Sequence, residues 1–85
     1  MMLEHRGLTS KIIADAIEVH RNLGTGFIES IYENALVLEL RKRGLEVEQQ
    51  VDVHVDYDGV VVGRHRLDLL VERMLVVELK AIQNL

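Results

Sequence analysis

The stretch VEQQVDVHVDYDGVVVGRHRLDLLV, residues 47–71, decides the fold class. Its first half alternates apolar and polar residues with a period of two, which is the pattern of a half-buried β-strand. Asp58-Gly59 is among the strongest two-residue signals for a hairpin turn. Together these features predict two antiparallel strands, Val47 to Tyr57 and Val60 to Val71. A third strand, from Met74 to Ala81, is expected directly after them.

Two helices are predicted before the strands. Apolar residues recur at helical spacing over 9–23, after Thr9 or Ser10 as N-cap, and again over 27–43, and a glycine follows each segment. Residues 1–8 carry no period, so we expect a flexible arm there and a single domain over 9–85. The order of elements predicts an α+β fold in which two N-terminal helices pack on a three-stranded antiparallel meander.

Composition narrows the class of protein. The chain has 85 residues, of which 48% are hydrophobic and 28% charged, and it contains no cysteine, which excludes disulfides and thiolate metal sites. No apolar run approaches the roughly 20 residues of a membrane helix, and the N-terminus lacks a secretory pattern, so we expect a soluble cytoplasmic protein without a membrane partner. The net charge of −4 argues against general nucleic-acid binding, although Arg41-Lys42-Arg43 could form a local basic patch.

The hairpin turn fixes an expected register for the first two strands. If Asp58 and Gly59 form the loop, Tyr57 faces Val60, and counting outward places Gln49 opposite Asp68. Under this register the second strand presents Asp68 on one face of the sheet and an apolar row on the other.

The second turn decides whether two carboxylates share a face. Glu-Arg suits a tight two-residue turn poorly, so we predict a three-residue loop, Glu72-Arg73-Met74. This loop would place Asp68 opposite Glu78, with Lys80 on the same face of the third strand.

Such a face has a chemical use. Two carboxylates beside a main-chain carbonyl form an oxygen-rich site for a hard cation such as Mg²⁺ or Mn²⁺. A neighbouring lysine can orient or deprotonate a water and can offset charge on a phosphate, which is the chemistry of phosphodiester hydrolysis. Taken alone, E-x-K is common on strands, where it is often only a polar face that discourages edge pairing.

The combination of these residues resembles a known group of enzymes. Asp68 with Glu78-Leu79-Lys80 is similar to the PD-(D/E)xK superfamily of restriction-endonuclease-like nucleases. Gly26-Phe27-Ile28-Glu29-Ser30-Ile31-Tyr32 also fits the G-x-x-E-x-x-Y signature of the GxxExxY proteins, a branch of that superfamily. The resemblance covers residues 10 to 82.

The resemblance implies roles for individual residues. Asp68, Glu78 and the main-chain carbonyl of Leu79 would hold Mg²⁺ or Mn²⁺, and Lys80 would be the catalytic lysine. Glu29 would reach the site from the second helix as an auxiliary ligand or water holder.

Three further residues are placed in supporting or substrate-binding roles. Tyr32 would support Glu29 or touch substrate, although a core-edge aromatic is an equally good interpretation. Gly26 would supply backbone freedom, and Arg66 lies two residues before Asp68 on the same strand.

The sequence therefore predicts a Mg²⁺-dependent nuclease that acts on DNA or RNA. The alternative is a non-catalytic module that self-associates or joins a larger complex and keeps the polar face of the nuclease fold. Members of the superfamily usually continue with a helix and a strand, so we expect a C-terminally shortened core. Its apolar row could then be covered by the first helix, by a second subunit, or by a missing part of a longer chain. We favour self-association, as a homodimer or larger complex, through Leu67, Leu69, Val71, Leu75, Val77 and Leu79.

Overall fold

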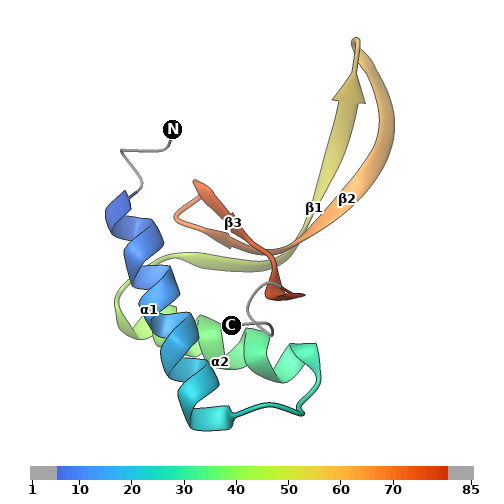
Figure 1. Ribbon diagram of the computed structural model, residues 1–85. Helices are drawn as coiled ribbons and strands as arrows, with labels where there is room; N and C mark the ends of the chain where they lie inside the picture. The colour runs from blue at the N-terminus through green and yellow to red at the C-terminus, as the bar shows by residue number, and fades with distance from the viewer. Residues whose placement is uncertain (1–5, 81–85) are drawn as a thin grey trace.

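The computed structural model describes residues 6–80 and contains two helices followed by a three-stranded antiparallel sheet. The elements are α1 (Arg6–Leu23), α2 (Glu29–Lys42), β1 (Val47–Tyr57), β2 (Val60–Val71) and β3 (Leu75–Val77). The strand order is β1-β2-β3. The helices lie at one end of the sheet, and the turn end of the β1–β2 hairpin extends away from them (Figure 1). The predicted α+β architecture is confirmed.

The helix boundaries differ from the sequence expectation at both N-termini. α1 begins at Arg6, so part of the expected flexible arm is helical, and half-buried Leu8 packs against the core from this first turn. α2 begins at Glu29, two residues later than expected. Gly26 has a φ of +103° and Ile28 is extended, so the backbone reaches helical geometry only after them. Residues 1–5 of the expected arm lie outside the described residues.

One apolar core joins both helices to the near end of the sheet. α1 buries a stripe at helical spacing, α2 buries Leu36, Val37 and Leu40, and the strands contribute Val47, Leu69 and Val71. Leu79 is also fully buried in this cluster. The side of the sheet that carries these strand residues is therefore the side on which the helices pack.

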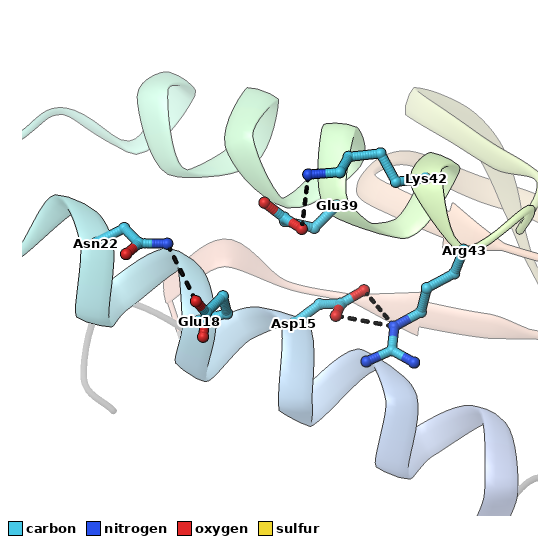
Figure 2. Close-up of polar contacts among 6 residues, drawn as sticks. All are labelled: Asp15, Glu18, Asn22, Glu39, Lys42 and Arg43. Atoms are coloured by element: carbon cyan, nitrogen blue, oxygen red, sulfur yellow. Dashed lines mark hydrogen bonds and ion pairs between the residues drawn. The ribbon is translucent and has the colours of Figure 1, made fainter.

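An ion pair joins the two helices at the edge of the core. Nε of Arg43, just after α2, lies 2.8 Å from both carboxylate oxygens of Asp15 in α1. Asp15 is buried, whereas Arg43 is partly exposed. Figure 2 shows this contact crossing between the helices, while the Asn22–Glu18 and Lys42–Glu39 contacts each stay within one helix.

The register of the β1–β2 hairpin corrects the sequence expectation. Tyr57 faces Val60 across the turn as predicted, but the pairing shifts between Val55 and Asp56, and Val62 is the extra residue. Beyond this bulge Gln49 faces Leu69, and the expected pairing of Gln49 with Asp68 is wrong. A one-residue slip moves every later side chain to the other face.

The consequence of the slip is that both apolar rows share one face. Val51 faces Leu67 and Val47 faces Val71, so the valines of β1 and the leucines of β2 lie on the helix side together. The expected arrangement would have exposed one of these rows. The bulge therefore lets a single layer of helices cover both.

The second turn matches the predicted loop, but the third strand is shorter than expected. Val71 faces Leu75, and residues 72–74 form the loop, closed by a 3.0 Å bond from the Met74 N–H to the Val71 carbonyl. Glu72 and Arg73 have φ values of +54° and +56°, the left-handed geometry that Glu-Arg was expected to avoid. β3 ends at Val77, so the expected strand from Met74 to Ala81 is wrong beyond that residue; Leu79 and Lys80 already have helical backbone, and Ala81 lies outside the described residues.

The apolar row that was expected to mediate self-association is covered by the chain itself. Leu69, Val71 and Leu79 are fully buried, and Leu67, Leu75 and Val77 are half-buried. The expectation of an uncovered patch there is wrong, because the register places this row on the helix side of the sheet.

Candidate metal-binding and catalytic site

Asp68 lies against the peptide that joins Glu78 to Leu79. Its Oδ2 accepts a 2.8 Å hydrogen bond from the Leu79 N–H. The residue is half-buried in β2, and Leu79 is buried in the core. β3 ends at Val77, so this side-chain bond holds Leu79 to β2 beyond the last strand pair, Leu69 with Val77. The structure thus brings Asp68 to the E-x-K segment by a different route from the predicted strand pairing.

The other two residues of the segment face solvent. The Glu78 side chain is about half exposed, and its Oε1 lies 3.7 Å from Nε2 of His65, an ion pair only when the histidine is protonated. Lys80 is exposed. Glu78 and Lys80 are therefore accessible to a ligand in solution, next to the peptide that Asp68 contacts.

Glu29 lies in the first turn of α2 and is exposed. Within residues 6–80, Glu29 is not grouped with Asp68 and Glu78 closely enough for the three carboxylates to hold one metal ion. Its role as an auxiliary ligand stays a prediction.

A second carboxylate on α2, not foreseen from the sequence, does contact the sheet. Glu33 is buried, and its two oxygens accept hydrogen bonds from the side-chain amides of Gln49, at 2.8 Å, and Gln50, at 2.9 Å. Gln50 has a left-handed φ of +53°, which interrupts the alternation of β1 and lets two successive residues reach the same helix. Gln50 lies across from Asp68, between the Gln49–Leu69 and Val51–Leu67 pairs.

Two signals in the sequence could have indicated Glu33. It follows Glu29 by four residues, so the two share a side of α2. The polar pair Gln49-Gln50 also breaks the apolar alternation of the strand at the level where the helix packs.

Tyr32 organises the loop between the helices. Its ring is buried, and its hydroxyl donates to the Gly24 carbonyl at 2.7 Å and accepts from the Phe27 N–H at 3.3 Å. The ring also meets Phe27 edge to face, with centroids 6.3 Å apart. The hydroxyl is therefore engaged by hydrogen bonds to the loop between the helices.

Gly26 and Arg66 complete the set of expected residues. Glycine is required at position 26 for the backbone conformation, with φ of +103°. It is not required for close packing, because a Cβ added there would meet nothing within 4 Å. Arg66 in β2 pairs with the directly opposite Asp52, Nε to Oδ1, at 3.0 Å, and both side chains are exposed.

The donor chemistry of Asp68 and Glu78 fits a hard divalent cation. Both are carboxylates, and Mg²⁺ usually keeps several waters and takes only one or two carboxylates from the protein. Within residues 6–80, no group of three or more histidine, aspartate or glutamate side chains is assembled for a metal ion. Water or substrate oxygens would have to complete the coordination.

Comparison with known proteins decides the family. A family model described as the PD-(D/E)XK nuclease superfamily matches residues 6–85. The chain belongs to the PD-(D/E)XK nuclease superfamily. Nucleases of this superfamily generally use divalent metals, in keeping with the oxygen donors of Asp68 and Glu78. No curated protein and no solved structure matches the chain. Over the part of this superfamily member that the structure describes, neither helix has the length and apolar character required to span a bilayer.

Proposed function

We propose that this protein is a metal-dependent nuclease of the GxxExxY branch, which hydrolyses phosphodiester bonds in DNA or RNA with Mg²⁺ or Mn²⁺. The observation that supports the proposal most is the 2.8 Å bond between Asp68 and the Leu79 N–H, in a chain of the PD-(D/E)XK nuclease superfamily. It joins Asp68 to the E-x-K tripeptide, which begins ten residues later in the sequence.

Asp68, Glu78 and the Leu79 carbonyl would hold the metal ion. When bound, such an ion lowers the pKa of a coordinated water and offsets charge on the phosphate. The hydrogen bond from the Leu79 N–H fixes one oxygen of Asp68, so the other oxygen is held in a defined position. A carboxylate that needs no reorganisation before ligand binding contributes more to catalysis than a mobile one.

Lys80 is exposed and directly follows Leu79, whose N–H is bonded to Asp68. Its ammonium group would stabilise negative charge that develops on a phosphate oxygen and would help to orient the attacking water. This role requires substrate to approach from the solvent side of the E-x-K segment.

Two glutamates of α2, Glu29 and Glu33, would act at different distances from the reacting phosphate. Glu29 is exposed and would hold a water or a second ligand position. Glu33 would act as a positioning residue, because it holds Gln50 in the left-handed conformation that lies across from Asp68.

Cleavage of nucleic acid by the purified full chain tests the proposal. Single- and double-stranded DNA and RNA are incubated with Mg²⁺, Mn²⁺ or EDTA, and product strands are quantified. We expect metal-dependent cleavage that falls about 100-fold or more in Lys80→Ala, the loss typical for removal of one charge-stabilising group. Asp68→Asn should have a comparable effect, because the amide oxygen can still accept the Leu79 N–H while the negative charge is lost.

Asp56→Asn is the matched control. It makes the same chemical change on an exposed residue of β1 that faces Val61 near the hairpin turn, away from the part of β2 that pairs with β3, and it should leave cleavage unchanged. Wild-type protein that cuts none of the substrates, or Lys80→Ala protein that cuts as fast as wild type, would refute the proposed function.

A further inference from the structure

β2 carries a basic segment beside the candidate site. Arg64, His65 and Arg66 are consecutive and exposed, in a chain whose net charge is −4. Nε2 of His65 lies 3.7 Å from Oε1 of Glu78, so the segment lies against the E-x-K tripeptide. β3 pairs with β2 only at residues 69–71, so the basic segment lies beyond the three-stranded part of the sheet. A ligand held by Glu78 would therefore have this segment as its neighbour.

The two arginines share the face of the sheet that carries Asp68. Successive residues of a strand point to opposite sides of the sheet. Leu69 is buried under the helices and Leu67 lies on the same side, so Asp68, Arg66 and Arg64 point to the other side. The helices leave that side open to solvent.

The two arginines differ in their partners. Nε of Arg66 lies 3.0 Å from Oδ1 of Asp52, and both side chains are exposed, so the pair is weak and an anion can compete with the carboxylate. Arg64 faces His54 across the hairpin and not a carboxylate. Over the described residues, 6–80, the ion pairs of β2 are those of Arg66 and His65. The Arg64 guanidinium is therefore available to an anion.

The spacing of these residues matches a repeating anion. Positions two apart on a strand are separated by about 6.4–6.8 Å, which is close to the distance between consecutive phosphates along one strand of nucleic acid. Arg64, Arg66 and Asp68 thus form a row of three positions with the phosphate repeat, the last of them at the candidate metal site. A guanidinium group binds phosphate through two parallel N–H bonds, which favours arginine in such a row.

We propose that Arg66 and Arg64 bind two successive phosphates of the substrate strand, next to the phosphate that is cleaved. This inference rests on the proposed function, because it places the reacting phosphate at Asp68 and Glu78. The strand would then run along β2 from the metal site toward the hairpin turn. Contacts to phosphates position a strand without reading its sequence. Two local arginines would let an acidic chain bind nucleic acid without a general basic surface.

Loss of one phosphate contact provides the first test. Fluorescence anisotropy of labelled single-stranded DNA and RNA measures binding to the full chain over a range of salt concentrations. Ca²⁺ replaces Mg²⁺, and the probe is checked to be intact afterwards. Arg64→Gln should weaken binding about 5- to 10-fold in about 50 mM salt and should reduce the slope of log K against log salt by about 0.7.

Arg21→Gln is the matched control for this change. It also removes one positive charge from an exposed arginine, but Arg21 lies in the last turn of α1, where it pairs with Glu18 at 3.4 Å. Affinity and salt dependence should stay close to those of wild type. Thermal unfolding of both glutamine variants checks that each folds.

Release of Arg66 provides a test in the opposite direction. Asp52→Asn removes the carboxylate that holds Arg66 and should tighten binding about twofold, a gain that misfolding could not produce. Asp56→Asn makes the same change four residues along β1, where the opposite residue is Val61, and should leave the affinity unchanged.

The outcomes separate this inference from the proposed function. Wild type that binds neither probe would overturn the phosphate contacts, and so would equal effects of the two glutamine variants or of the two asparagine variants. Wild type that cuts nucleic acid while Arg64→Gln binds as wild type does would overturn the contacts and leave the nuclease function in place. The predicted changes in binding without any cleavage by wild type would support the contacts and refute the nuclease function.

Discussion

The two ends of the β1–β2 hairpin are built from the same residue types and have different environments. Near the helices, Val47, Leu69 and Val71 are buried, and at the turn Val55 and Val60 are exposed on the same face. The alternation of the strands is the same at both ends. Strand periodicity thus identifies the apolar face of a sheet, while the position of the helices at one end of the sheet decides which part of that face is covered (Figure 1).

Valine-to-alanine substitution at the two ends should give the largest difference. Val71→Ala removes two methyl groups from a fully buried position and should lower the free energy of unfolding by about 2–3 kcal/mol. Val61→Ala, in the exposed part of the same strand, should cost less than about 1 kcal/mol, mainly through β-propensity. Urea unfolding of dilute protein measures both values. Equal losses would mean that the turn end of the β1–β2 hairpin is covered as well as the core.

Two Asp–Arg pairs provide a second comparison. Asp15 is buried and joins α1 to Arg43, whereas Asp52 and Arg66 face each other across β1 and β2 and are both exposed. Double-mutant cycles with alanine should give a coupling energy of about 1–2 kcal/mol for the first pair and below about 0.5 kcal/mol for the second. Raising the salt concentration should reduce the second coupling further. Similar couplings for both pairs would contradict the burial of Asp15.

The two tyrosines provide the smallest and most specific difference. Tyr32→Phe removes a hydroxyl that makes two hydrogen bonds to the interhelical loop, and it should lower the free energy of unfolding by about 1 kcal/mol. Tyr57→Phe removes an exposed hydroxyl and should change it by a few tenths of a kcal/mol at most. Thermal unfolding of the two variants compares them directly. A larger loss for Tyr57→Phe would show that its hydroxyl has a partner in solution.

The hairpin shows how far the sequence predicts this fold. The Asp58-Gly59 turn and both long strands have the predicted boundaries, because turn chemistry and alternation are local signals. The bulge at Val62 could not be predicted, since three successive valines are equally suitable for pairing. What selects the register is the burial of Leu69 and Val71 under the helices, which is a property of the whole fold.

The sequence predicted the residues of the candidate site better than it predicted their geometry. Asp68 and the E-x-K segment are adjacent, as expected, but through the Leu79 N–H and not through strand pairing with Glu78. Glu33 was not predicted, although its spacing from Glu29 and the Gln49-Gln50 pair could have indicated it, because its contact with Gln50 depends on a left-handed conformation that glutamine does not signal.

The bulge at Val62 also determines how the hairpin tolerates a change in length. Val62 is the one residue of β2 between the turn and Gly63 that has no partner in β1. Deleting it would leave a regular ladder in which Tyr57 still faces Val60 and Val55 still faces Gly63, so no other side chain would change faces. Removing a paired residue closer to the core, such as Leu67, would instead turn the residues between it and the turn toward the opposite side. The hairpin can therefore lose one residue near its turn without altering the surface that contacts the helices.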